Sequence, residues 1–199
     1  MSARVVMPDG QPIEGAIVLA TWKANGWINN GSLGQVAIEE AMTDKNGQFR
    51  IPAWGPRFIS AGMVNIEEPT IRVFHQGFVP LVLSNFNGIG MRAAPSIIKF
   101  RFQDKPLVLN PFHGSFIEYE KALVPLNNSL DFIIFDPPET LSGRCYWKAI
   151  PKMLVAVEQA RISLVRKGAG QTLRSLSQYV MADKPECGNP KEFFQGLFE

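Results

Sequence analysis

The sequence predicts a mainly β protein that ends in a helical region. Two dipeptides that favour hairpin turns, Asp9-Gly10 and Asn46-Gly47, each separate short runs of β-type residues. The chain of 199 residues also contains 17 Gly and 15 Pro, which suits a β protein rich in loops. We therefore predict a β-sandwich over residues 1–110. A helical C-terminal extension over residues 111–199 is expected to pack on it.

Composition and charge limit the class of protein. Hydrophobic residues make up 46% of the chain and charged residues 19%, enough to bury a sizeable core. The formal net charge of +2 gives little support to a nucleic-acid partner. No apolar run reaches the length needed to cross a bilayer. We therefore expect neither nucleic-acid binding nor a membrane span.

The predicted strands differ in how their two faces are covered. Residues 16–22 are almost continuously apolar, which is typical of a strand that is covered on both faces or lies at the centre of a sandwich. In the strand 70–75, Ile71 and Val73 alternate with Arg72 and Phe74, so the two sets point to opposite faces. The strands expected in chain order are residues 4–7, 16–22, 35–43, 48–51, 70–75, 78–83 and 97–102, with 107–109 as one more.

Helical signals follow the strands. Ser115 with Glu118 three residues later has the pattern of a capping box, which predicts a short helix that continues through Leu123. The segment Asp136-Pro137-Pro138 then interrupts the chain. Further helices are expected over residues 150–165, over residues 173–180, and from Asn189-Pro190 onward, because Asn caps a helix well and Pro is tolerated at its first position.

Basic residues are concentrated in the C-terminal part of the chain. Residues 1–143 hold 11 Lys/Arg and 13 Asp/Glu, a net of −2, whereas residues 144–199 hold 9 and 5, a net of +4. A basic helix can bind an anionic polymer or lipid headgroups. The alternative is that these residues form the solvated outer face of a helix that is docked on the sandwich.

Several blocks of the sequence resemble a known family. They are Val5-Val6 before the first turn, and then residues 12–18, 43–51 and 71–80. Together, over about residues 4–83, they resemble the carboxypeptidase regulatory-like domain, a member of the transthyretin-like (prealbumin-like) group. The resemblance implies a Greek-key β-sandwich of about seven strands. It also implies an accessory or binding module without catalytic residues of its own.

The two cysteines, Cys145 and Cys187, lie outside the region of resemblance. Their number permits one disulfide or two unrelated buried thiols. A helical tail with two cysteines on this module is similar to exported proteins of Gram-negative bacteria. That similarity implies a Cys145–Cys187 bridge and a periplasmic or otherwise extracytoplasmic location, reached after removal of a signal sequence.

Residues that could carry catalysis are few. Nucleophilic catalysis needs a base and a group that orients it, and the only histidines are His75 and His113. His75 falls in a predicted strand, where a structural role is expected. His113 lies in an irregular segment two residues before Ser115, and a hydrolase centred on His113 is the alternative function. No zinc or phosphate-loop spacing occurs, so we expect no metal, no cofactor and no enzymatic activity.

Long loops that carry tryptophan or asparagine are the expected binding surface. Trp27 and Trp54 lie on two of these loops, and Asn85 and Asn87 lie on a third. Binding residues concentrate on loops that a rigid scaffold positions. We therefore expect a non-catalytic binding or accessory protein that recognises another protein or a cell-envelope polymer. A third hypothesis is a structural or inhibitory component of an envelope assembly that uses the basic helix.

Overall fold

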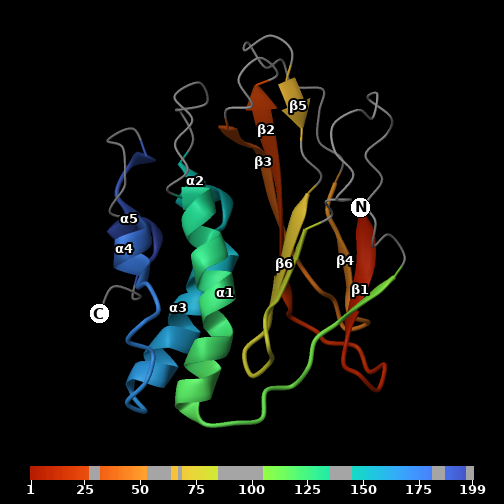
Figure 1. Cartoon of the computed structure of the whole chain (residues 1–199), viewed down its shortest axis with the longest axis vertical. Coiled ribbons are helices and arrows are strands. Elements are labelled where there is room, and N and C mark those ends of the chain that lie inside the picture. The colour runs from red at the N-terminus through yellow and green to blue at the C-terminus, as the bar shows by residue number, and fades with distance from the viewer. Residues whose placement is uncertain are drawn as a thin grey trace.

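The fold is built on two β-sheets with helices stacked against one of them (Figure 1). The computed structural model describes residues 1–26, 32–52, 64–66, 69–84, 105–134, 145–180 and 187–195. The three layers follow the order three-stranded sheet, five-stranded sheet, helices. This arrangement confirms the predicted β-rich region followed by C-terminal helices. The helices form a layer of their own on the five-stranded sheet.

The smaller sheet has the strand order β4-β1-β8. Strand β1 (Ser2–Val6) is antiparallel to β4 (Gln48–Arg50) and parallel to β8 (Pro106–Val108). The prediction of an additional strand near residues 107–109 is therefore confirmed. The expected strand at 97–102 lies outside the residues that the structure describes.

The larger sheet is antiparallel and has the order β3-β2-β6-β7, with β5 paired to the end of β2. Its long central strand β2 pairs with both β3 and β6, so β2 has no free edge. The strands of this sheet are β2 (Ile17–Gly26), β3 (Ser32–Met42), β5 (Val64–Ile66), β6 (Thr70–Phe74) and β7 (Leu81–Ser84).

The two predicted turns are confirmed in their backbone geometry. Gly10 and Gly47 have φ angles of 85° and 70°, which glycine adopts without the penalty that a Cβ would bring. A Cβ on Gly47 would also collide with the carbonyl oxygen of Val5. In the second turn, Asp44 Oδ1 accepts hydrogen bonds from the backbone N–H of Asn46 (2.8 Å) and Gln48 (2.9 Å). These residues are therefore selected for turn geometry.

Strand β2 is covered on both faces, as its continuous apolar sequence predicts. Val18 and Ala20 face the three-stranded sheet, whereas Ile17 and Leu19 face the helices. The same alternation holds in β6, where Ile71 and Val73 belong to the core between the sheets and Phe74 packs under the helices. The larger sheet therefore separates two hydrophobic cores.

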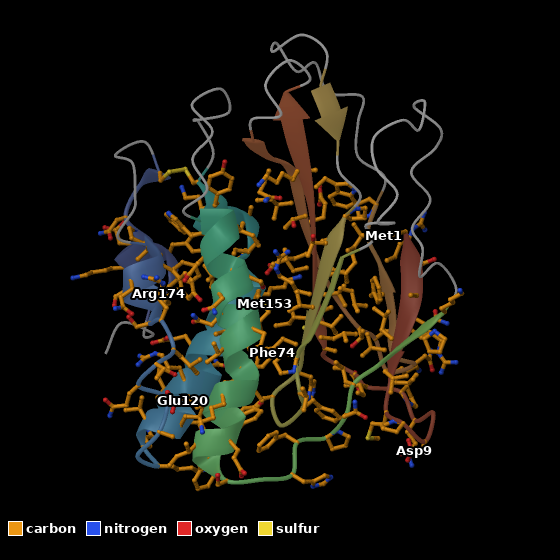
Figure 2. All side chains as sticks on the ribbon, in the orientation of Figure 1. Met1, Asp9, Phe74, Glu120, Met153 and Arg174 are labelled. Atoms are coloured by element: carbon orange, nitrogen blue, oxygen red, sulfur yellow. A yellow bond between two sulfur atoms is a disulfide. The ribbon has the colours of Figure 1, made fainter. Side chains whose placement is uncertain are left out.

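Among the residues that the structure describes, five helices form the third layer, which Figure 1 shows beside the larger sheet. Figure 2 shows Phe74 and Met153 in the space between the larger sheet and these helices, where both side chains are fully buried. The helices are α1 (Phe116–Ile134), α2 (Tyr146–Ala149), α3 (Pro151–Val165), α4 (Leu176–Val180) and α5 (Pro190–Phe193).

The capping box at Ser115 is confirmed, but the predicted end of its helix is wrong. Glu118 Oε2 accepts from Ser115 N at 2.7 Å, and Ser115 Oγ accepts from Glu118 N at 3.3 Å. The helix continues past Leu123 to Ile134, with Pro125 in its interior. A proline inside a helix costs about 3 kcal/mol. Burial stabilises by about 1.5–3 kcal/mol for each large apolar side chain, so the buried stripe outweighs the proline. That stripe is Leu123, Leu126, Leu130 and Ile133.

Three of the four later helices that the structure describes were predicted, and some of their boundaries differ from the prediction. Helix α3 begins at Pro151 as expected, but the short helix α2 just before it was not predicted. Helix α4 begins at Leu176 instead of residue 173 because Ser175 caps it: Gln178 N donates to Ser175 Oγ at 3.4 Å, and Ser175 N donates to Gln178 Oε1 at 2.9 Å. Helix α5 begins at Pro190 with Asn189 as its cap, as predicted.

A carboxylate from the sheet caps the longest helix after α1. Glu40 of β3 accepts hydrogen bonds from the backbone N–H of Lys152 (3.0 Å) and Met153 (2.8 Å) at the start of α3. The first N–H groups of a helix have no partner within the helix, so this contact satisfies two of them. It also sets the position of α3 relative to the sheet.

A buried arginine joins the sheet to α1. Arg72 of β6 donates from Nε to Ser129 Oγ at 2.8 Å and from Nη1 to Thr21 Oγ1 at 3.0 Å. Within the described part of the chain, no carboxylate forms an ion pair with Arg72. Burial lowers the pKa of Arg72 to about 10, so its side chain stays charged at neutral pH. Its charge is compensated by hydroxyl and carbonyl oxygens.

Side chains of α1 hold the segment that precedes α4. Glu120 Oε1 accepts from the backbone N–H of Thr172 at 2.6 Å. Asn127 Oδ1 accepts from the backbone N–H of Arg174 at 2.9 Å and from the hydroxyl of Tyr179 at 2.8 Å. Figure 2 shows Glu120 and Arg174 on the side of the helical layer that faces away from the sheets. Directional contacts therefore orient each outer segment of this layer.

We expect Glu40→Ala to lower the free energy of unfolding by about 1 kcal/mol, because it leaves two N–H groups of α3 without their cap. The matched control is Glu39→Ala, since Glu39 is the neighbouring carboxylate on the same strand and no contact of it caps a helix. Urea denaturation of both variants measures the difference. Equal losses in the two variants would show that the cap has no specific role.

The same cap makes stability depend on pH. Burial raises the pKa of Glu40 above its ordinary value of 4.5, and the hydrogen bonds from Met153 and Lys152 only partly oppose this. A carboxyl with a raised pKa in the folded state contributes stability that is lost as the pH rises through that pKa. We expect the free energy of unfolding of the wild type, minus that of Glu40→Gln, to fall as the pH rises above the ordinary pKa of 4.5. An increase over this range, measured by urea denaturation, contradicts the assignment.

Candidate functional site

A groove on the helical layer is the candidate site. It has a cavity volume of about 620 Å³ and lies between the first turns of α3 and the end of α5. A concave surface of this size is large enough for several side chains of a ligand. Its lining includes Lys152 and Val155 of α3 and Glu192, Phe193, Phe194 and Gln195 of the α5 region.

Three aromatic rings in contact form the apolar part of this site. The Trp147 ring of α2 lies 5.1 Å from the Phe193 ring and 5.5 Å from the Phe194 ring, measured between centroids. Trp147 and Phe194 are buried, whereas Phe193 is 50% exposed. The two buried rings therefore support Phe193, which presents an apolar surface to solvent at the groove.

A disulfide holds the groove together. Cys145 immediately precedes α2, and Cys187 lies three residues before α5. The two cysteines are bonded, with a Cα–Cα distance of 5.4 Å, which confirms the predicted bridge. Helix α5 has only four residues and would be marginal alone. The covalent link keeps it against α2 and α3.

Lysines surround the aromatic rings. Lys148 Nζ lies 5.2 Å from the centroid of the Trp147 ring, and Lys152 and Lys191 are exposed. None of these three lysines forms an ion pair with another described residue. The nearby carboxylate of Glu192 is engaged, because it accepts a hydrogen bond from Asn189 Nδ2 at 2.9 Å. The groove therefore combines an apolar wall with one lysine and one glutamate in its lining, and the carboxylate of Glu40 also interacts with the charge of Lys152. Lys148 and Lys191 add positive charge near the groove.

The loop residues predicted to bind a partner are Trp27, Trp54, Asn85 and Asn87, and all four lie outside the residues that the structure describes. That prediction stays a prediction. The groove itself was missed by sequence reasoning. A usable signal was present, since each cysteine lies within seven residues of an aromatic side chain that forms the groove, Trp147 or Phe193.

The arrangement around His113 does not bring together the parts of a hydrolase. His113 is exposed, and no described residue forms a hydrogen bond with its ring. The hydroxyl of Ser115 donates to Glu118 Oε2 at 2.8 Å, so it belongs to the helix cap. Hydrogen bonds from Ser115 also lower the pKa of Glu118. His75 Nδ1 lies 3.0 Å from the carbonyl oxygen of Gln76, a local contact next to the β6–β7 turn.

Helix α3 does not present a continuous basic face among the described residues. Arg161 is paired with the buried carboxylate of Glu158 at 2.6 Å, and Glu158 also accepts from the backbone N–H of Leu176 at 3.0 Å. The exposed lysines lie at opposite ends of the helix, Lys152 in its first turn and Lys167 two residues after its end. The geometry therefore does not favour a function based on one basic helix face.

Comparison of the chain with family models, with curated proteins and with solved structures finds no match in any of the three. The described residues include no cluster of three or more His, Cys, Asp or Glu side chains that could hold a metal ion. In the same part of the chain, no helix has both the length and the hydropathy of a membrane span.

We expect the double variant Cys145→Ser/Cys187→Ser to unfold with a free energy lower by about 4 kcal/mol, from the loop-closure entropy of a loop of this length. The bond closes a loop with a sequence separation of 42 residues. Urea denaturation checks the magnitude, and near-ultraviolet circular dichroism reports whether the Trp147 cluster loosens. If the oxidised and the reduced wild type had the same midpoint of urea denaturation, the disulfide would not stabilise the fold.

Proposed function

We propose that this protein is a non-catalytic binding protein that recognises an acidic, apolar segment of a protein partner. One observation carries the proposal. The half-exposed side chain of Phe193 lies in a groove that is also lined by the exposed side chain of Lys152. A disulfide holds the elements that carry these side chains.

The chemistry of the groove indicates the class of ligand that it binds. Aromatic side chains supply most of the binding energy where an apolar group of a partner can cover them. The buried rings of Trp147 and Phe194 keep Phe193 in place, so little ordering is needed on binding. Exposed lysines beside an apolar surface attract an anionic group. A segment with an aromatic or aliphatic side chain beside a carboxylate meets both conditions.

The use of the buried carboxylates supports binding over catalysis. Glu40, Glu120 and Glu158 each accept hydrogen bonds from backbone N–H groups at the start of a helix or turn. A general base must be free to reach a substrate proton. These carboxylates instead hold the helical layer in place.

The compartment follows from the disulfide. Disulfides persist in oxidising, extracytoplasmic environments. The disulfide between Cys145 and Cys187 therefore favours such a compartment. We propose the periplasm of a Gram-negative bacterium, on the basis of the resemblance described above. We also propose that about residues 4–83 form a carboxypeptidase regulatory-like module with transthyretin-like Greek-key topology. The glycine turns at Gly10 and Gly47 and the two-sheet arrangement support this.

The loops that carry Trp27, Trp54, Asn85 and Asn87 remain a second proposed binding surface, for a protein or an envelope polymer. They belong to the β-sandwich region of the sequence, whereas the groove belongs to the helical layer. Variants of the groove therefore test the two surfaces separately.

The groove is tested with 8-anilinonaphthalene-1-sulfonate, a fluorescent probe that is both aromatic and anionic. We expect Phe193→Ser and Lys152→Glu each to weaken its binding by about tenfold, because each removes one of the two recognised features. Matched controls are Val108→Ser and Lys105→Glu, which alter exposed residues of the three-stranded sheet region.

A peptide competition then tests the partner chemistry. An acidic peptide that contains phenylalanine should displace the probe, and the same peptide with lysine in place of its acidic residues should not. The proposal is wrong if the control variants weaken binding as much as the groove variants. It is also wrong if the basic peptide competes equally well.

A further inference from the structure

One end of the helical layer exposes large apolar side chains from two helices. Phe116 and Ile117, in the first turn of α1, are 47% and 58% exposed, and Val165 at the end of α3 is 42% exposed. Lys167 Nζ lies 4.3 Å from the centroid of the Phe116 ring, so the two helix ends are adjacent. Figure 1 shows the start of α1 and the end of α3 at the same end of the molecule.

The turn between β6 and β7 extends this surface. Gly77 N donates to the hydroxyl of Tyr119 at 2.8 Å, and Phe112 N donates to the carbonyl oxygen of Gly77 at 2.8 Å. These contacts place the turn against the first turns of α1. Val79, two residues further on, is another exposed apolar side chain. We call this set, Val79, Phe116, Ile117 and Val165 with the neighbouring bases, the apolar end.

The fold does not need these side chains to be apolar. Helix α1 packs through a stripe that begins at Tyr119 and continues through Leu123 and Leu126, and the stripe does not include Phe116 or Ile117. Scattered exposed apolar residues are ordinary, but a group that is rimmed by charged residues marks an interaction site.

Positive charge borders the apolar end. Arg166 and Lys167 directly follow Val165 and are exposed, and Lys121 is exposed one turn along α1. The acidic groups on the same stretch of α1 are Glu118, which accepts hydrogen bonds from the N–H and hydroxyl groups of Ser115, and Glu120, which accepts from Thr172 and is buried. Lys121 interacts with the carboxylate of Glu118, so the bases that border the apolar side chains without a carboxylate partner among the described residues are Arg166 and Lys167.

We propose that the apolar end docks on the surface of an anionic lipid bilayer. Proteins that bind membrane interfaces combine aromatic and aliphatic side chains, which enter the headgroup region, with Lys and Arg, which contact lipid phosphates. Lys167 lies over the exposed ring of Phe116. In a dry protein interface this lysine would lose its hydration, and interface cores are depleted in lysine. At a bilayer surface the same ammonium group meets phosphate oxygens.

The geometry leaves the groove accessible when this end is docked. The groove is lined by residues of the first turns of α3, whereas Val165 is the last residue of that helix. A helix of 15 residues is about 22 Å long. The apolar end and the groove are therefore separate surfaces, and the lipid proposal does not depend on what the groove binds.

The test is sedimentation of the protein with vesicles of phosphatidylcholine, with or without phosphatidylglycerol. We expect binding to the anionic vesicles at low ionic strength, weaker binding as salt is added, and little binding to neutral vesicles. Phe116→Ser/Ile117→Ser and Arg166→Glu/Lys167→Glu should each reduce the affinity by about tenfold or more. Matched controls are Met42→Ser/Val108→Ser, in the strands β3 and β8, and Lys45→Glu/Lys105→Glu, in the segments that precede β4 and β8. They change exposed residues away from the apolar end and should retain binding.

Each other outcome overturns the proposal. The proposal is wrong if the protein does not bind anionic vesicles at low ionic strength. It is also wrong if the control variants lose as much vesicle affinity as the variants of the apolar end. If the protein forms a dimer that Phe116→Ser/Ile117→Ser dissociates, and does not bind vesicles, the apolar end is a self-association surface. Thermal melting of each variant shows that it is folded. Phe193→Ser should retain vesicle binding, which separates this test from that of the groove.

Discussion

The larger sheet is apolar on both faces, and the rest of the structure follows from the need to cover both. Strand β2 directs Val18 and Ala20 to one side and Ile17 and Leu19 to the other. The three-stranded sheet covers the first face and the helices cover the second. Burial stabilises by about 25 cal/mol for each Å² of apolar surface removed from water, so an uncovered face would be unstable. The same burial explains why α1 continues through Pro125.

Apolar burial is non-directional, so polar contacts decide where each helix lies. Glu40 sets the start of α3, and Arg72 connects the sheet to α1 through Ser129. Glu120 sets the segment before α4. These groups are charged yet largely removed from water, and such groups are stable only when their hydrogen-bond partners are present. Glu40 and Arg72 therefore fix α3 and α1 on the sheet, and Glu120 fixes the segment before α4 on α1.

The two proposed surfaces result from this arrangement. Because Glu40 places the first turn of α3 and the disulfide places α5, Lys152 and Phe193 come to lie in one groove. Because α3 runs the length of the layer, its other end brings Lys167 to Phe116 of α1. One helix thus separates a groove suited to an acidic apolar segment from an end suited to an anionic surface.

The sequence by itself determined the features that depend on near neighbours. The turns at Gly10 and Gly47, the capping box at Ser115 and the cap at Asn189 are encoded within four or five residues, so local patterns suffice. The continuous apolar run of β2 also predicted that both its faces are covered. The disulfide was expected from the resemblance and from an even number of cysteines.

Only the tertiary structure decided the features that join distant parts of the chain. The length of α1 depends on a stripe buried against the sheet, which outweighs the local effect of Pro125. The groove joins Lys152 to Phe193, 41 positions apart in the printed sequence, and Glu40 reaches Met153 across 113 positions. Local sequence patterns do not contain such contacts. They form only when the helices pack on the larger sheet, and that packing is driven by burial of the apolar face of the sheet.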